Sequence, residues 1–219
     1  MNKTIFLWLE CIGIFILIPV LLWLRVVSTP LIMIPVVMLC VPVIFWLGRK
    51  YGYTRTIFWQ GVRNAERIQL VTIINRFLLI SVVLFSIVFA AYPLHLFDLP
   101  RSNPIFWLIL LALYPLFSVY PQELLYRSFF FRRYERLFSN QQHLVVLNAL
   151  MFGWMHIVFH NGLAVVFSIV AGFLFADTFR KTQSLRLTCL EHSLYGWLIF
   201  TLGYAEAFLY EPWLRTLTQ

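Results

Sequence analysis

The chain contains, at residues 105–131, the stretch IFWLILLALYPLFSVYPQELLYRSFFF. This stretch is long and apolar enough to cross a bilayer as one helix, because a spanning helix needs about 20 mostly apolar residues. It nevertheless carries two ionisable side chains, Glu123 and Arg127, which are four positions apart and therefore share one face of the helix. Pro121 precedes them and is expected to kink the helix or interrupt its hydrogen bonds. The stretch predicts a membrane-spanning helix with a buried charge pair.

The composition predicts that the rest of the chain is built in the same way. Hydrophobic residues make up 61% of the 219 residues and charged residues 12%, whereas soluble domains are about half apolar and about a quarter charged. This composition excludes a soluble enzyme, a disordered chain and a nucleic-acid-binding protein. The net charge of +8 is therefore interpreted as loop charge that sets membrane topology. The predicted fold is all-α, a polytopic membrane helix bundle surrounded by membrane lipid.

Seven segments are candidate spans, and the residues after them form either an interfacial tail or an eighth span. The bundle is therefore expected to have about seven to eight transmembrane helices. The last candidate is the least hydrophobic because it contains Glu191 and His192. The seven candidates are residues 5–24, 30–47, 70–92, 105–131, 144–159, 163–179 and 187–202.

The basic residues indicate how this bundle is oriented. With the N-terminus in the cytoplasm, thirteen Lys and Arg residues, Arg76 among them, are assigned to the inner side and three to the outer side. This distribution follows the positive-inside rule, which the reverse orientation would violate. Only Arg127 then remains at membrane depth. The chain is predicted to be a multi-pass protein of a bacterial inner (plasma) membrane with a cytoplasmic N-terminus.

Polar side chains at predicted membrane depth all lie in the C-terminal half of the chain. Ionisable groups in hydrocarbon are costly and are functional by default, so the chemistry is expected in this half. His156 and His160 are four positions apart and could together bind a metal, or His160 could simply cap a helix end next to Asn161. The polar residues concerned are Gln122, Glu123, Arg127, His156, His160, Glu191 and His192.

Each of these groups also has a structural interpretation. Glu123 and Arg127 can form a salt bridge that only stabilises the bundle, and His156 can be a core histidine bonded to a neighbouring helix. Glu191 can lie at a helix N-terminus, where the helix dipole favours an acidic side chain. For His192, a capping role fits the local sequence as well as a catalytic one.

The residue inventory excludes most ways of cutting a peptide bond inside a membrane. Asp98 lies in a predicted loop and Asp177 near a span end, so an aspartyl dyad is not expected. The motifs HExxH and GxSxG, which zinc and serine hydrolases use, are absent, as are the glycine motifs that bind nucleotides. Glutamate and histidine remain. A glutamate beside a histidine can activate water as a general base, while a second histidine stabilises an oxyanion.

The segment 122–127, with the sequence QELLYR, resembles the EExxxR motif of the CPBP family. These proteins are the CAAX-processing and bacteriocin-processing intramembrane endopeptidases, also called the Abi family. The segment 152–156, FGWMH, is similar to the family's FxxxH motif, and His192 to the histidine of its Hxxx(N/D) motif. The resemblance covers residues 105–202 and implies an intramembrane endopeptidase of the glutamate type.

The resemblance also implies how the chain is divided and what it acts on. It implies N-terminal transmembrane helices at 1–104, a catalytic four-helix core at 105–202 and a tail at 203–219. The implied substrate is a protein or peptide at the membrane. No cofactor is expected, and a zinc site made of Glu123 and the histidines 156, 160 and 192 is the alternative.

By the same resemblance, Glu123 and His156 are expected to hold and activate the attacking water, and His192 to stabilise the oxyanion. If these residues form one catalytic unit, their side chains converge on a single cavity. We therefore expect the Glu123 carboxylate and the His156 ring to lie within reach of one shared water, with His192 facing the same cavity from another helix.

Gln122 is counted as catalytic with the three residues above, and three further residues are assigned supporting roles in this site. Arg127 is expected to orient Glu123, and Gln122 to position water or the substrate backbone. His160 and Asn161 are counted as supporting residues at the outer end of their helix.

Two positions depart from the pattern of the family. Gln122 stands where the motif has its first glutamate, and a glutamine can hold a water but cannot take its proton. Gly196, four residues after His192, stands where the motif has Asn or Asp, so an oxyanion donor is missing. Asn161 or Tyr195 could supply that donor instead.

These departures keep two other functions open. The first is a non-catalytic relative that binds the membrane segment of a partner. The second is a proton-coupled transporter that uses Glu123 and His156 as a relay. Transporters commonly show internal repeats with broken helices in both halves, and polar spans occur only in the second half of this chain.

Overall fold

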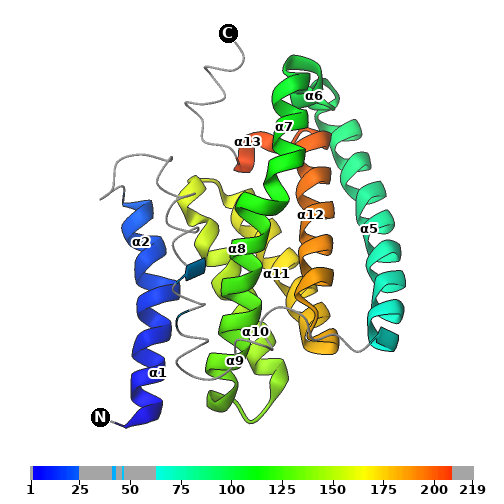
Figure 1. The fold of residues 1–219 in the computed structure, drawn as a ribbon. Helices are drawn as coiled ribbons and strands as arrows, with labels where there is room; N and C mark the ends of the chain where they lie inside the picture. The colour runs from blue at the N-terminus through cyan, green and yellow to red at the C-terminus, as the bar shows by residue number, and fades with distance from the viewer. Residues whose placement is uncertain (1, 25–40, 43–45, 47–62, 209–219) are drawn as a thin grey trace.

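The computed structural model describes residues 2–24, 41, 42, 46 and 63–208, and within these ranges every regular element is a helix. Side chains are described in them except at 63–65. The helices run roughly along one direction as a bundle (Figure 1). The helix α1–α2 stands at one flank, α5 at the opposite flank, and the helices between α7 and α12 fill the space between them. The predicted all-α membrane bundle is thereby confirmed.

The helix bounds follow the chain in order. The first helix consists of α1 (Lys3–Ile12), the π-helical turn η1 (Gly13–Leu17) and α2 (Ile18–Trp23). Next come α5 (Arg63–Ala91), η3 (Pro93–His95) and α6 (Asp98–Ser102). One long run then joins α7 (Pro104–Tyr114), η4 (Pro115–Val119), α8 (Tyr120–Glu123), η5 (Leu124–Phe129), α9 (Phe130–Tyr134) and η6 (Glu135–Leu137). The remaining elements are α10 (Gln141–Met155), η7 (His156–Phe159), α11 (Gly162–Thr182), α12 (Leu185–Leu202) and α13 (Ala205–Phe208).

Five helices in the described part of the chain are long and apolar enough to cross a membrane, and the chain is a multi-pass membrane protein. They correspond to five of the seven predicted spans. The span predicted at 30–47 lies almost entirely outside the described residues, as does the tail from 209 onward. The five helices are Lys3–Trp23, Glu66–Ala91, Pro104–Leu137, Gln141–Phe159 and Gly162–Thr182.

The seventh predicted span exists as a helix but differs in character from the other five. It forms α12, which is not among the helices apolar enough to span a membrane by composition. This helix contacts α5, α7, α8 and α11, so neighbouring helices enclose much of its polar surface. The predicted total of seven to eight spans, the division of the chain at 104 and 202 and the cytoplasmic N-terminus stay predictions.

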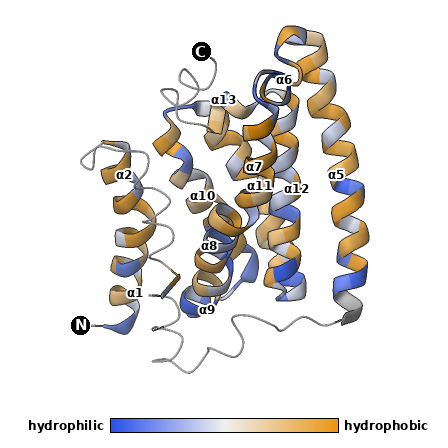
Figure 2. Ribbon diagram, turned by 45° about the horizontal axis from the view of Figure 1, so that its top comes forward, coloured by the Kyte–Doolittle hydropathy of each residue, from blue (hydrophilic) through white to orange (hydrophobic). Residues whose placement is uncertain are grey.

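The outward faces of the bundle are suited to lipid. On α5, the side chains of Leu79, Val82 and Phe89 are 66%, 64% and 62% exposed. A soluble protein would rarely leave such a row of large apolar residues in water, whereas lipid chains accommodate it. Hydrophilic positions interrupt the otherwise hydrophobic helices on α5, α8 and α12 (Figure 2). The hydrogen bond from Arg76 of α5 to Glu191 of α12 shows that such polar side chains meet between helices.

The long helical run 104–137 continues through its two internal prolines by widening into π-helical turns. Pro115 is the first residue of η4, and Pro121 lies in α8 just before η5 begins. Proline has no backbone N–H to donate, so the ordinary ladder of hydrogen bonds cannot pass it unchanged. The expected interruption at Pro121 therefore takes the form of an extra-wide turn rather than a broken helix. Glu123 ends α8 between these two π-helical turns.

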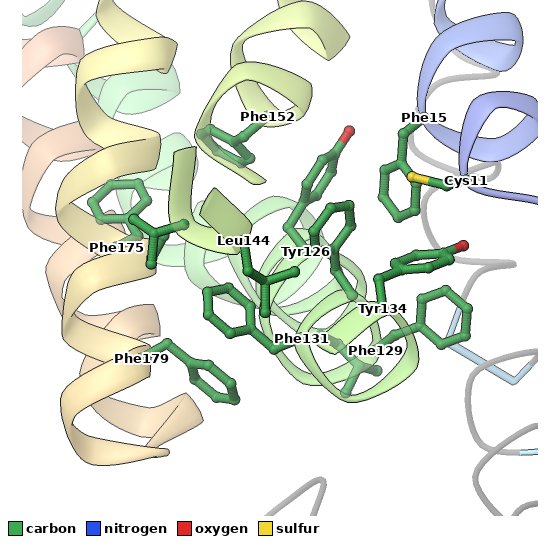
Figure 3. Packing of buried hydrophobic residues seen from close by; sticks show 14 of the residues in the cluster. Cys11, Phe15, Tyr126, Phe129, Phe131, Tyr134, Leu144, Phe152, Phe175 and Phe179 are labelled. Atoms are coloured by element: carbon green, nitrogen blue, oxygen red, sulfur yellow. The ribbon is translucent and has the colours of Figure 1, made fainter. Parts of the chain in front are cut away.

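Aromatic side chains pack the N-terminal helix against the long run (Figure 3). Phe15, fully buried in η1, has its ring centroid 5.0 Å from that of Phe130, 5.2 Å from that of Tyr126 and 6.1 Å from that of Tyr134. All three contacts are edge-to-face, the arrangement that aromatic quadrupoles favour. The π-helical turn at 13–17 thus presents one phenylalanine to three rings.

A charge pair reinforces this contact. Glu10 accepts two hydrogen bonds from Arg133, at 2.8 Å from Nε and 2.7 Å from Nη2, and a third at 3.1 Å from the Tyr134 hydroxyl. The expectation that membrane-depth polar groups occur only in the C-terminal half is therefore wrong for Glu10. A paired, two-pronged arginine–carboxylate contact explains how this acid is tolerated in an apolar helix.

We predict that Phe15→Ala loosens the N-terminal helix. The variant removes three ring contacts and leaves a cavity. We expect the free energy of unfolding to fall by roughly 3 kcal/mol. This is the low end of the range for a buried phenylalanine, because burial of apolar surface is driven less strongly in lipid than in water. Thermal unfolding in detergent measures the change. The control is Phe6→Ala on the same helix, where the side chain is 44% exposed. An equal loss in both variants would contradict the prediction.

Candidate active site

Glu123 lies at the centre of the polar cluster and is fully buried. Its Oε1 atom is 2.8 Å from Nδ1 of His192, which comes from α12. Its Oε2 atom is 3.1 Å from Nε of Arg127, one turn further along its own helical run. The second contact is an ion pair without the alignment of a hydrogen bond. One carboxylate oxygen therefore accepts a hydrogen bond from a residue 69 positions away, and the other lies beside an arginine.

Arg127 is held by more than its carboxylate partner. Its Nη1 donates to the Oδ1 atom of Asn148 at 2.6 Å, and Nδ2 of Asn148 donates to the carbonyl of Tyr126 at 2.6 Å. The guanidinium also lies over two rings, with Cζ 4.9 Å from the centroid of Phe152 and 5.7 Å from that of Phe175. Cation–π contact and ion pairing together offset the cost of burying this charge completely. Arg127 lies beside Glu123, and its expected role in orienting that carboxylate stays a prediction.

Asn148 is a site residue that the sequence reasoning missed. It is fully buried in α10, and both ends of its amide are used to hold Arg127 against the backbone of the neighbouring helix. Its position gives the only available signal, because Asn148 is a strong polar group in the middle of an apolar predicted span.

His192 is fixed in one orientation by its neighbours. Its ring stacks on Phe175 with centroids 4.7 Å apart and planes 22° apart, and it meets the ring of Phe152 edge-on at 5.5 Å. With Nδ1 donating to the Glu123 carboxylate, the neutral ring has its proton on Nδ1 and leaves Nε2 as an acceptor. Among the described residues, Nε2 has no partner.

His156 has the same tautomer for a different reason. It is the first residue of η7, where α10 tightens, and its Nδ1 donates to the backbone carbonyl of Phe152 at 2.8 Å. A carbonyl oxygen can only accept, so the neutral ring again leaves Nε2 unprotonated. The ring is buried, with an exposed fraction of 8%, and packs 5.0 Å from the ring of Phe152.

The ring of Phe152 joins these groups into one cluster. The rings of His156 and His192 and the guanidinium of Arg127 all contact it. In Figure 3, Phe152 and Phe175 lie close together on neighbouring helices, where they form part of the wall of this cluster. The contact of Glu123 is with His192, and a direct contact of Glu123 with His156 is not found in the described part of the chain. The water shared by Glu123 and His156 stays a prediction.

Gln122, His160 and Asn161 lie outside this cluster. Gln122 is half-buried, and its amide donates to the Ser118 hydroxyl at 2.8 Å. His160 is exposed, ends η7 with a left-handed backbone (φ 53°) and stacks on Trp23. The side chain of Asn161 accepts a hydrogen bond from the backbone of residue 163 and so caps α11. The capping interpretation therefore fits His160 and Asn161.

A second polar network includes Glu191, the residue before His192. Glu191 is fully buried; its Oε1 is 2.6 Å from Nη2 of Arg76 on α5, and its Oε2 accepts from the Thr178 hydroxyl on α11 at 2.6 Å. Thr178 in turn accepts from Gln69 at 2.9 Å and from Arg76 at 3.0 Å. This network clamps α5, α11 and α12 together next to the Glu123 cluster.

Two expectations are corrected by this network. Glu191 lies beyond the first turn of α12, where the helix dipole would stabilise an acidic side chain. It pairs with Arg76 instead. Arg76 lies within the spanning helix Glu66–Ala91, so it is not a loop charge and Arg127 is not the only arginine at membrane depth. Its place inside the apolar predicted span 70–92 was the signal that the basic-residue count overlooked.

The zinc alternative can be compared with this geometry. Across the described residues, no three His, Cys, Asp or Glu side chains are close enough to hold one ion together. The set of Glu123 with three histidines is not assembled, because His160 stacks on Trp23 at the C-terminal end of η7.

Comparison with known families gives one match. The family described as type II CAAX prenyl endopeptidase Rce1-like matches residues 102–198. This range contains Glu123, Arg127, His156 and His192, and it agrees with the expected resemblance to the CPBP family, which is confirmed. Neither the curated proteins nor the solved structures gave a match.

We predict strong coupling between the two charges of the cluster. Glu123→Gln leaves Arg127 as a buried unpaired cation, and Arg127→Met leaves a buried carboxylate, so each should lower the free energy of unfolding by roughly 3–5 kcal/mol. The double variant should lose much less than the sum, because no lone charge remains.

The matched control for this cycle is the pair Asp177–Lys181, which has the same spacing but is partly exposed. Asp177→Asn and Lys181→Met should each change the free energy of unfolding by only about 0.5 kcal/mol. Thermal unfolding in detergent gives all the values. Additive losses at Glu123 and Arg127 would show that the two charges do not depend on each other.

Proposed function

We propose that the chain hydrolyses a peptide bond at the membrane with water activated by its buried Glu/His cluster. Residues 102–198 match the family described as type II CAAX prenyl endopeptidase Rce1-like. At the level of the family it is an intramembrane endopeptidase and therefore a hydrolase. The observation that carries the proposal is the 2.8 Å contact between Glu123 and His192. This contact joins the QELLYR segment to His192 in one buried site. Phe152, the first residue of the FxxxH segment, packs against His192 in the same site.

The contact favours a general-base role for His192. Glu123 is fully buried, with Oε1 bonded to His192 and Oε2 beside Arg127, so the carboxylate is better placed to hold His192 than to take a proton from water itself. A carboxylate that accepts from Nδ1 orients an imidazole and stabilises the imidazolium that forms when Nε2 takes a proton. This division of roles replaces the oxyanion role first expected for His192, and Glu123 still drives the activation of water.

His156 completes the proposed activation of water. Its Nε2 is an acceptor, because Nδ1 is committed to the carbonyl of Phe152. A water held between the Nε2 atoms of His156 and His192 would have both protons directed at bases and a lone pair free for attack.

The proposed reaction consumes one water for each bond cut. The water oxygen bonds to the carbonyl carbon, its proton moves to Nε2 of His192, and the carbonyl π pair moves onto the oxygen. When that pair returns, the C–N bond breaks and the same proton passes to the leaving nitrogen. The products are one carboxylic acid and one amine, and His192 is neutral again.

The substrate class follows from the setting and from the family. A site enclosed by membrane helices acts on a protein or peptide that is held at the membrane. The name of the matching family refers to prenylated CAAX sequences, and such a peptide is the first substrate to test on this chain. A peptide with the same sequence but no prenyl group, and an unprenylated transmembrane segment, are the comparisons.

We predict that His192→Gln and His156→Gln each lower kcat by about 100-fold or more, the usual effect of removing a general acid–base group. The purified protein in liposomes is incubated with the three peptides, and mass spectrometry identifies the new termini. The control is His143→Gln, which replaces an exposed histidine on the same helix as the FxxxH segment.

Cleavage that survives both variants at the wild-type rate would overturn the proposed site. The reaction as proposed uses no metal ion, so a chelator should leave the rate unchanged. Loss of activity together with stoichiometric zinc would replace this mechanism with a metal-assisted one.

A non-catalytic role is the second candidate, and the position of Gln122 favours it. This glutamine replaces the first glutamate of the motif, and its amide is bonded to Ser118 on its own helix. A relative that has lost activity would still clamp a membrane segment of a partner. If the wild type cuts none of the peptides, Gln122→Glu tests this role. Newly gained cleavage would identify a decayed enzyme. Continued inactivity would show that the loss of the glutamate at 122 is not what prevents cleavage.

A further inference from the structure

Gly196 lies four residues after His192, on the same face of α12. A side chain there would stand beside the imidazole, but the end of the Tyr114 ring occupies the space. A Cβ atom built at Gly196 would overlap with Cε1 of Tyr114 and lie 2.6 Å from both Cζ and the hydroxyl oxygen. The missing side chain of α12 is thus replaced in space by a phenol from another helix.

Tyr114 reaches this position from the end of α7. Its ring is edge-on to His192, with centroids 5.9 Å apart and planes at 79°, and edge-on to Phe200 at 5.1 Å. These two contacts hold the ring from both sides of Gly196. Among the described residues, the hydroxyl has no hydrogen-bond partner. A positioned phenol with an unused donor therefore lies next to the histidine that is bonded to Glu123.

The two histidines of the cluster offer no free donor. The Nδ1 protons of His156 and His192 are both committed, and their Nε2 atoms are acceptors while the rings are neutral. Arg127 has N–H groups at Nε and Nη2 without a hydrogen-bond partner. Its guanidinium is, however, fully buried against the rings of Phe152 and Phe175. Hydrolysis places negative charge on the carbonyl oxygen, and a positioned donor at that oxygen is among the largest contributions to such reactions.

We propose that the Tyr114 hydroxyl is this donor: it hydrogen-bonds to the carbonyl oxygen of the scissile bond as charge develops there. The inference rests on the proposed function and adds a catalytic residue to it. It explains why α12 has glycine at 196, since any larger residue would collide with the ring that supplies the donor. Asn161, which caps α11, is not needed for this role.

Tyr195 is the rival donor, because it is three residues from His192 and its hydroxyl is buried without a partner. Its ring packs on Phe77 of α5 and on Phe175 of α11. Tyr195 therefore lies on the side of α12 that faces α5 and α11, whereas the Tyr114 ring reaches α12 from α7. The two hydroxyls can be separated by removing each in turn.

The test begins with Tyr114→Phe, which keeps the ring and removes only the hydroxyl. We expect kcat on the cleaved peptide to fall about 100-fold, as for the loss of one oxyanion donor, with KM changed less than about twofold because the donor acts mainly on the transition state. The midpoint of thermal unfolding should stay the same. Tyr120→Phe, a half-buried tyrosine in the same helical run, is the matched control and should keep the wild-type kcat.

An exchange of the donor between helices gives a readout that a structural role would not produce. Tyr114→Ala empties the space over Gly196, and adding Gly196→Asn places an amide donor there from α12. We expect the double variant to exceed the kcat of Tyr114→Ala at least 10-fold. Gly196→Asn alone should unfold at a lower temperature, because its side chain meets the Tyr114 ring.

The outcomes distinguish the inference from the proposed function. An active wild type whose kcat is unaffected by Tyr114→Phe overturns the inference and leaves the proposed function standing. A 100-fold loss in Tyr195→Phe with none in Tyr114→Phe gives the role to Tyr195 and also overturns it. A wild type that cleaves none of the peptides overturns both. A loss in Tyr114→Phe together with recovery in the exchange variant supports the inference.

Discussion

The carboxylate of Glu123 is the interaction on which the arrangement of the core depends. It is buried completely, with Arg127 on one oxygen and His192 on the other. A lone charge in such a place would cost several kcal/mol, so neither partner can turn away without a large penalty. The rotation of α8 and the depth of α12 are therefore tied to each other. The aromatic rings that cover Arg127 and stack on His192 help to bury the Glu123–Arg127 ion pair.

Polar networks of this kind have a particular value in a membrane. Lipid chains are as apolar as leucine, so burial of apolar surface does little to bring membrane helices together. In this chain, three polar contacts join helices that are far apart in sequence. Glu10 and Arg133 join α1 to α9, the Glu123 cluster joins α8, α10 and α12, and Glu191 joins α12 to α5 and α11. Each acid has an arginine partner, which lets an apolar bundle contain charge and specify which helices meet.

Much of this could be predicted from residues close together in the chain. The apolar runs predicted five spans that the structure contains, because a membrane helix makes all its backbone hydrogen bonds within one segment. The spacing of Glu123 and Arg127 predicted their pairing, because residues four apart meet on one helix face. The same local reasoning failed for Arg76, which was counted as a loop charge, and for Glu191, which was placed at a helix N-terminus. Each has its partner on another helix.

The sequence by itself therefore determined the class of fold, the pair within one helix and the residues that match the family over 102–198. Only the tertiary structure decided that Glu123 holds His192, that Asn148 holds Arg127, and that the ring of Tyr114 fills the space over Gly196. These contacts join residues from 21 to 82 positions apart, and their geometry depends on how each helix is rotated and how deep it lies. Rotation and depth are set by packing among all the helices at once, and no local pattern of residues contains that information.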